Sequence, residues 1–376
     1  MNATASRSWR RNWLSLTPWT TAARSLAPDT APVIDIWYGT DQTFGAPGRA
    51  QNWVNILGNV SDAENNVTQL SYTVNGGAPL TATVGAGNQT RLAMPGDFNI
   101  EIPWTSLDPG PNTVAITATD AQSETASTSV TVNYEAGNVW PLPYSIDWTE
   151  VTDLQEVVQV VDGLWEVDTA AGVLRPALAN QYTYDRMVAI GDVTWRDYEV
   201  TVPITIHRFF GQDPGVGILT RWEGHELNGV GTQPSSRYPY GGLGWYRYAS
   251  YTGHAALKIE GNGTTIAEDQ TGLELEIGVT YVFKMRAWSP GGGSQHWYML
   301  KVWEQGTPEP AEWNLSGSEV VAEDAFGSIA LVAHRADASF GPVTITPLPT
   351  DEGMILSNIQ VVDTPTVGDE TVRYTT

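Results

Sequence analysis

Residues 221–251 combine the side-chain types that bind sugars. The stretch mixes arginine, histidine and tryptophan with tyrosine, and glycines separate several of its aromatic residues. Sugars present apolar C–H faces beside hydroxyl groups, so a site for them needs flat aromatic rings next to polar side chains. We therefore predict a ligand-binding surface formed by Arg221, Trp222, His225, Trp245, Tyr246, Arg247 and Tyr248, together with His207. Arg237, Tyr238, Tyr240 and Tyr251 extend the same run.

A second interpretation of this run stays open. Alternate aromatic residues of its strands could fill the core of a β-sandwich while the arginines are solvated. Arg221 and Trp222 are neighbours in the sequence. On a regular strand they point to opposite faces, so one of them must point inward. Because a charged residue is rarely buried, we expect Arg221 to be the outward one.

Further polar residues are predicted to share one face of a sheet. They are His207 with Arg208, Lys284 with Arg286, and Lys301 with Trp303, all on segments with strand patterns. Residues on neighbouring strands converge on a common face when their alternation is in register. An ordinary exposed strand face is the alternative. We interpret His334, at the end of an apolar strand, as a structural edge residue.

The sequence contains no recognisable catalytic motif. Glu274 and Glu276 are two residues apart, but the Glu-x-Asp-x-x-Glu run of laminarinase-type sandwich glucanases is missing. Gly-x-Ser-x-Gly, His-Glu-x-x-His and phosphate-binding glycine loops are also missing. A lyase could use His225, Tyr246 and Arg221, but any aromatic-rich sandwich offers such a set. We favour a binding protein and leave enzymatic activity open.

The composition excludes several partners and chemistries. Acidic residues number 42 against 19 basic ones, so the formal net charge is −23. Such a chain is repelled by nucleic-acid phosphates and anionic lipids. It has no cysteine, which excludes disulfides and thiolate metal sites. No stretch reaches the roughly 20 apolar residues that a membrane-spanning helix needs.

Calcium is the one ion for which the sequence offers ligands. Asp62, Glu64 and Asn66 lie in the run SDAENN, and Asp120 lies in TATDAQ. Carboxylate and amide oxygens of this kind bind calcium. Turns without a metal explain the same residues equally well. No other cofactor is predicted.

Alternating apolar residues predict strands throughout, and the closing stretch has a family resemblance. Within GSIALVAHRADASFGPVTITPL, residues 328–334 and 343–348 are predicted strands, with Asp337, Ser339 and Gly341 forming a turn. This pattern resembles the closing strands of concanavalin A-like (laminin-G-like) jelly-roll sandwiches. In residues 197–207 the even positions are apolar, and Pro203 predicts an edge strand or a bulge.

Two other segments resemble modules of bacterial exported proteins. The phrases GNVSDAENNVTQLSYTVNGG and PGPNTVAITATDAQSET resemble Ig/cadherin-like repeats, and residues 354–376 resemble the first two strands of a fibronectin type III-like module. We therefore expect an all-β chain, an Ig-like sandwich followed by a concanavalin A-like sandwich. The predicted divisions are 1–31 as a disordered leader or export segment, 32–134, 139–349, and 354–376 as a partial module or tail. The two central segments are expected to fold independently.

These resemblances imply a function outside the cell. The expected protein is a carbohydrate-binding or adhesion module of a larger secreted or cell-surface bacterial protein, with a polysaccharide or cell-surface glycan as its partner and further domains in the same chain. A polysaccharide-degrading enzyme of the same fold and a structural spacer in an adhesin are the alternatives.

Overall fold

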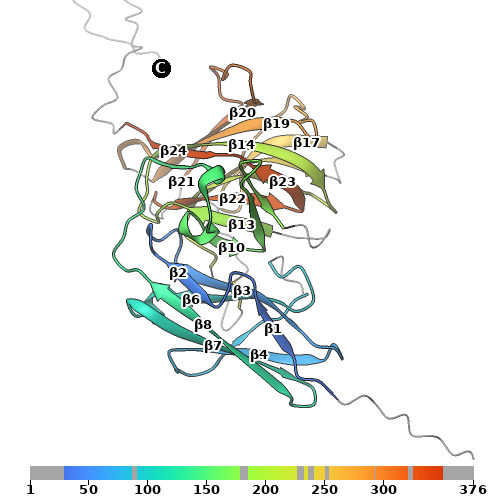
Figure 1. The fold of residues 1–376 in the computed structure, drawn as a ribbon. Coiled ribbons are helices and arrows are strands. Elements are labelled where there is room, and N and C mark those ends of the chain that lie inside the picture. Colours follow the sequence, from blue (N-terminus) through green and yellow to red (C-terminus); the bar gives the residue numbers. More distant parts are fainter. Residues whose placement is uncertain are drawn as a thin grey trace, which may run out of the picture.

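The computed structural model describes residues 29–86, 91–177, 185–226, 233–235, 241–249, 254–292, 294–320 and 325–349. They form two β-sandwiches that lie against each other (Figure 1). The prediction of an all-β chain built from sandwiches is confirmed, while the exact domain divisions and independent folding stay predictions. Most of the predicted leader and the whole of residues 354–376 lie outside the described residues. Among the described helices, none has the length and apolarity needed to cross a membrane.

The first sandwich consists of a three-stranded and a five-stranded sheet. The three-stranded sheet has the order β1 (Val33–Ile36), β3 (Trp53–Ser61), β6 (Asp97–Pro103). The five-stranded sheet has the order β2 (Asp41–Phe44), β8 (Thr125–Tyr134), β7 (Gly110–Asp120), β4 (Val67–Val74), β5 (Leu80–Ala82), and β2 and β8 are parallel. Every second residue of β7 is buried, including Val114 and Ile116, because alternate side chains of a strand face the opposing sheet.

The second sandwich packs a seven-stranded sheet on a nine-stranded one. The seven-stranded order is β10 (Gln159–Asp162), β13 (Asp185–Ile190), β22 (Ser328–His334), β15 (Gly215–Trp222), β16 (Gly242–Ala249), β17 (His254–Glu260), β18 (Thr265–Glu268). The nine-stranded sheet has the order β11 (Trp165–Asp168), β12 (Val173–Pro176), β23 (Ala336–Phe340), β14 (Tyr198–Phe209), β19 (Thr280–Trp288), β20 (Gln295–Glu304), β21 (Leu315–Val320). In addition, β24 (Val343–Pro347) pairs with β14, and β9 (Tyr144–Ile146) pairs with β24. Short 3₁₀ turns occur at Trp104–Ser106, Trp148–Glu150, Leu154–Glu156 and Pro290–Gly292.

The closing stretch crosses from one sheet to the other. Strand β22 lies inside the seven-stranded sheet, and β24 belongs to the nine-stranded one. The predicted turn between them is wrong, because residues 336–340 form a third strand, β23, next to β14. Arg335 has a φ of +50° and lies between β22 and β23. A backbone in this left-handed region reverses the chain sharply, and the reversal carries it between the sheets.

Pro203 does not mark an edge strand. Strand β14 pairs with β19 along one side. Along the other side it pairs first with β24, through residues 198–201, and then with β23, through residues 204–209. Pro203 lies between these two partners. Its missing N–H is tolerated there because neither strand needs it as a donor.

The two sandwiches share an extensive interface. The Trp53 indole donates to the carbonyl of His225 at 2.7 Å, and the Asn52 backbone donates to the carbonyl of Glu223 at 2.7 Å. Ala50 and Leu57 of the first sandwich belong to the hydrophobic core of the second. Each sandwich would therefore lose buried contacts if the two were separated.

A buried ionic network lies in this interface. The fully buried Arg91 of the first sandwich forms ion pairs with Glu101 of β6 and, at 2.7 Å, with Asp162 of β10. Asn99 also donates to Asp162, at 3.1 Å. Burial raises the pKa of Asp162 to about 7, although the positive charge of Arg91 opposes the rise. Arg91 thus joins carboxylates from both sandwiches in a site shielded from water.

This raised pKa predicts a pH dependence of stability. The Asp162 pKa is higher in the folded state than in the unfolded state, so its contribution to stability is complete below about pH 4 and is lost as the pH rises to about 7. Asp162→Asn keeps an acceptor for Arg91 and should remove up to about 4 kcal/mol of this decline. Urea unfolding between pH 4 and 8 measures it. The exposed Asp153→Asn is the control, and identical wild-type and Asp162→Asn profiles would contradict the assignment.

Candidate functional site

Arg221, predicted to face solvent, lies inside the molecule. Its φ is +57°, at an irregularity where the pairing of β15 with β22 shifts register. Its guanidinium donates to the Ser289 hydroxyl at 2.7 Å and to the Tyr298 hydroxyl at 3.3 Å, and it stands 5.1 Å from the Tyr298 ring centre. Burial raises the pKa of Tyr298 to about 12, so its hydroxyl stays neutral. Arg221 therefore links β15 to Tyr298 of β20 and to Ser289 after β19, and its guanidinium is not accessible to a ligand.

Trp222 and His225 lie in the interface between the sandwiches. The Trp222 side chain is fully buried and donates to the side-chain oxygen of Gln51 at 3.0 Å. Its ring meets the His225 ring edge to face. His225 Nε2 is 3.7 Å from Asp162 Oδ2. Burial lowers the pKa of His225 well below its usual value, and Arg91 adds to the effect, so the imidazole is neutral.

Trp245 and Tyr246 point to opposite faces of the seven-stranded sheet. The Trp245 ring covers Gly215, where an added Cβ would come within 2.7 Å of it, so only glycine fits below the indole. The Arg247 guanidinium lies 4.9 Å from the Trp245 ring centre and covers its other side. Tyr246 is in the core beside Phe209. Neither Trp245 nor Tyr246 therefore has an exposed ring face on which a sugar could stack.

The predicted surface is therefore not assembled as one exposed site. Arg221, Trp222, His225, Trp245 and Tyr246 are all buried. Tyr248 is 38% exposed, Arg247 is half-buried, and His207 is exposed on the other sheet. Arg237, Tyr238, Tyr240 and Tyr251 lie outside the described residues.

The second group of predicted residues does share a face. In β14, the alternate residues from Tyr198 to Ile206 are buried, which leaves residues such as Thr201 outward. Thr201 pairs with Lys284 of β19, which pairs with Lys301 of β20. Arg286 and Trp303 point the same way, because they lie two residues from these lysines on the same strands. The outer face of the nine-stranded sheet therefore carries these four side chains, whereas the alternation does not place Arg208, which follows a register shift in β14, on it.

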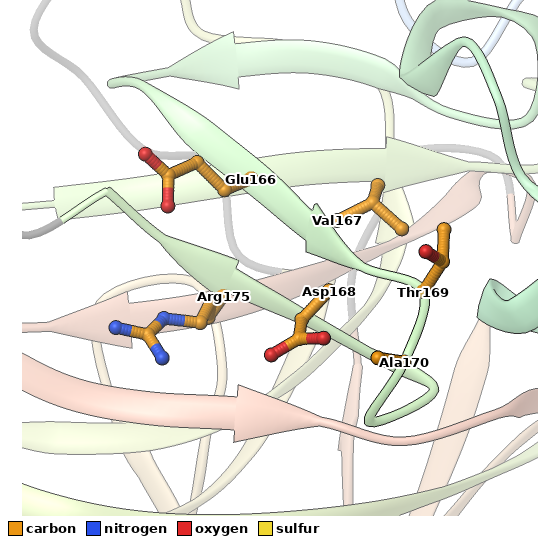
Figure 2. A pocket seen from close by; sticks show the side chains of 6 residues that line it. All are labelled: Glu166, Val167, Asp168, Thr169, Ala170 and Arg175. Atoms are coloured by element: carbon orange, nitrogen blue, oxygen red, sulfur yellow. The ribbon is translucent and has the colours of Figure 1, made fainter.

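A shallow hollow of about 360 Å³ lies at the β11–β12 end of this sheet. Glu166, Val167, Asp168, Thr169, Ala170 and Arg175 line it. Figure 2 shows the two carboxylates and the guanidinium projecting from the neighbouring strands β11 and β12. Glu166 pairs with Arg175 across the strands. The hollow thus combines acceptors with a planar array of donors on an accessible surface.

Polar side chains continue from the hollow onto the neighbouring strands. Leu174 of β12 pairs with Phe340 of β23, so the adjacent Arg175 and Ser339 share the outer face. The Ser339 hydroxyl is in hydrogen-bonding contact with Nε2 of the exposed His207. One polar row therefore runs from β11 across β23 to β14.

The far side of this face is aromatic, and its cations are paired. Trp313 lies between two cations, with Arg286 at 5.0 Å and Lys301 at 4.7 Å from its ring centre. Glu309 accepts from Lys284 at 2.8 Å and from Lys301 at 3.2 Å. The hydrogen bond from Lys284 lowers the pKa of Glu309. Trp297 and Trp303 are half-buried on the same face.

The sequence analysis missed the hollow. Its signal was present as Glu166 and Asp168, two residues apart in a strand pattern, the same spacing that drew attention to Glu274 and Glu276. The contribution of Arg175 depends on how β11 pairs with β12 and could not be recognised from composition. Glu274 and Glu276 are exposed in the segment before β19, outside any strand.

The protein thus consists of two β-sandwiches, and the outer face of its nine-stranded sheet carries polar and aromatic side chains. No family model and no curated protein matches the chain. Among solved structures it is similar to the carbohydrate binding module CBM66 from Bacillus subtilis, with 17% identity over 50% of this chain and 94% of that one and a TM-score of 0.32.

Two further solved structures have a similar degree of likeness. The metal-free carbohydrate recognition domain of Emp46p has 10% identity over 55% of this chain and 97% of that one, with a TM-score of 0.37. Xylan beta-1,4-xylosidase from Bacillus halodurans C-125 has 12% identity over 79% of this chain and 63% of that one, with a TM-score of 0.36. At these values none of the likenesses shows a family or a ligand.

The burial of Trp222 predicts a structural role. Trp222→Ala should lower the free energy of unfolding by about 3–5 kcal/mol, because it removes a fully buried ring and the hydrogen bond to Gln51. Tyr248→Ala, at an exposed ring, should change stability by less than about 1 kcal/mol. Chemical unfolding of both variants measures the difference. Equal, small effects would show that Trp222 is not part of the packed interface.

Proposed function

We propose that the protein binds a neutral glycan across the outer face of its nine-stranded sheet. The observation that carries the proposal is the open hollow, in which Glu166 and Asp168 stand beside Arg175. Carboxylates accept hydrogen bonds from sugar hydroxyls, and the guanidinium donates to them. Hydrogen bonds of charged groups are the stronger kind, which suits binding at a water-exposed surface.

The geometry of the face favours an extended ligand. Between β12, which carries Arg175, and β20, which carries Trp303, lie four strand spacings of about 4.8 Å, or roughly 19 Å. A chain of several sugar units laid across the strands could hydrogen-bond in the hollow and place an apolar sugar face on Trp303. Residues such as Pro203 and Thr205 occupy the sheet between these ends.

The charge pattern favours a neutral ligand over an acidic one. Lys284 and Lys301 are both paired with Glu309, and Arg286 is paired with Glu199 at 3.1 Å. These cations are therefore largely neutralised by neighbours. The net charge of −23 would repel polyanions in addition.

An extracellular or cell-surface location follows from this proposal, since polysaccharides of that size are met mainly outside the cell. Attachment to further domains and a part in adhesion belong to the same proposal. The proposal is supported by the acidic composition and by the position of β14, β19 and β20, which lie on the side of the second sandwich away from the first (Figure 1).

Binding can be tested with a glycan array followed by affinity electrophoresis in neutral and acidic polysaccharides. Glu166→Gln and Arg175→Gln should each weaken binding to a neutral hit about tenfold or more, since a hydrogen bond of a charged group contributes about 1.5–3 kcal/mol. Trp303→Ala should weaken binding by roughly threefold to tenfold, because it removes the stacked ring. Their melting temperatures should stay within about 2 °C of the wild type, because these side chains are not in the core.

Two control variants test whether binding depends on residues outside this face. Glu135→Gln changes an exposed carboxylate in the linker, and Tyr248→Ala changes an exposed ring of the other sheet. Both should bind like the wild type. Binding lost in Tyr248→Ala but kept in the three face variants would overturn the proposal.

The same samples test the enzymatic alternative. Glu166 and Asp168, two residues apart on one strand face, are the carboxylate pair that glycoside hydrolysis would use. Release of reducing ends that disappears in both Glu166→Gln and Asp168→Asn would assign a hydrolase in place of a binding module.

A further inference from the structure

At the end of the first sandwich that is remote from the second, four buried side-chain oxygen atoms receive no hydrogen bond from the described residues. They are Asp29 Oδ2, Asp62 Oδ2, Asn66 Oδ1 and Asp120 Oδ2, all shielded from solvent and without a hydrogen-bond partner among the described residues. Asp120 is 2% exposed and Asp62 is 9% exposed. Buried acceptors without donors are costly, so a group of four is evidence for a ligand that supplies positive charge.

The turns hold these carboxylates in place. Asp62 Oδ1 accepts from the Glu64 backbone at 2.8 Å, and Asp120 Oδ1 accepts from the Gln122 and Glu124 backbones at 2.8 and 2.9 Å. One oxygen of each carboxylate is thus occupied by its turn. The other, Oδ2, remains available to a ligand.

Hydrogen bonds between segments place Asn66 and Asp29 near the turn that carries Asp120. Asn66 follows β3 and lies beside the β7–β8 turn, where its carbonyl accepts from the Ala121 backbone at 3.1 Å. Its side-chain nitrogen is 3.5 Å from Asp29 Oδ1 and donates to Gln122 at 2.8 Å. Asp29 leads into β1, and burial together with the adjacent Asp120 carboxylate raises its pKa. Asp29, Asn66 and Asp120 are therefore close together at this end, and Asp62 lies in the neighbouring turn between β3 and β4.

We propose that Asp29, Asp62, Asn66 and Asp120 form a calcium site. All four donors are oxygens, which calcium prefers, and calcium tolerates a flexible shell completed by main-chain oxygens and water. Magnesium demands a near-ideal octahedron, which side chains from three separate segments supply less readily. In the described residues no group of three or more acidic, histidine or cysteine side chains closes around one point. The four side chains must therefore move closer together to enclose the ion.

The site differs from the sequence prediction in one ligand. Glu64 was predicted as a ligand, but its carboxylate accepts from the Thr30 hydroxyl at 2.9 Å. Asp29 takes its place. Strand β3 runs from Trp53, at the interface, to Ser61, beside the site, a rise of roughly 27 Å. The ion therefore acts at the free end of the first sandwich and not at its junction with the second.

Calcium should stabilise the chain by binding only its folded state. Calorimetry of the whole protein in EDTA, in CaCl₂ and in MgCl₂ tests this. Millimolar CaCl₂ should raise the melting temperature of the first sandwich by about 6 °C at a tenfold excess over Kd, and MgCl₂ should raise it less. Equilibrium dialysis should give one ion per chain with a Kd of about 10⁻⁴–10⁻³ M.

Variants locate the ion. Asp120→Asn and Asp62→Asn keep the acceptor that each turn needs but remove the charge, so each should weaken calcium binding at least about tenfold. Asn66→Asp adds a fourth carboxylate and should tighten binding several-fold. Asp269→Asn is the matched control, because Asp269 accepts from backbone N–H groups two and four residues ahead, as Asp120 does, but lies in the second sandwich.

The outcomes decide the proposal. No melting shift between EDTA and 10 mM CaCl₂ overturns it. A shift that survives unchanged in both Asp62→Asn and Asp120→Asn places calcium elsewhere and also overturns it. If one of these variants fails to fold, the other variant and the tightening expected for Asn66→Asp still test the site.

Discussion

The arrangement of the molecule depends on one buried charge. Arg91 has no exposed side-chain surface, and its partners come from both sandwiches. A guanidinium deprived of water is tolerated only when carboxylates and carbonyls replace its hydration. Glu101, Asp162 and the Ser235 carbonyl do so here. The sandwiches must therefore stay docked with β10 against the first module, which leaves the outer face of the nine-stranded sheet on the free side of the molecule (Figure 1).

The alternation of apolar residues within a strand was sufficient to predict which of its side chains point into the core. The alternation in β14 predicted that every second residue from Tyr198 to Ile206 points inward, and the same rule predicted that Lys284 and Lys301 point outward on neighbouring strands. These predictions hold because side-chain direction has a period of two, whatever the rest of the chain does. The all-β class and the shared polar face could thus be predicted from the sequence.

The sequence could not predict the burial of residues that are covered by segments distant in the chain. Trp222 is covered from the first sandwich through Gln51, and Trp245 is buried because Gly215 on the neighbouring strand leaves room for its ring. Arg221 has a left-handed backbone, and its partners Ser289 and Tyr298 are 68 and 77 residues away. Aromatic and arginine residues suit a sugar site and a packed interface equally well by chemistry. Only the tertiary pairing distinguishes the two.

The pairing of charges also explains how an acidic chain can carry cations on the face proposed to bind glycans. Each lysine or arginine on the aromatic side of the face has a glutamate partner, so the face is close to neutral while the chain as a whole has a charge of −23. Paired charges hold Trp313 and its neighbours in place without creating a strong field. The surrounding negative charge keeps copies of the protein apart. The proposed recognition of a glycan would then rest on stacking and on directional hydrogen bonds, which salt screens less than it screens attraction between net charges.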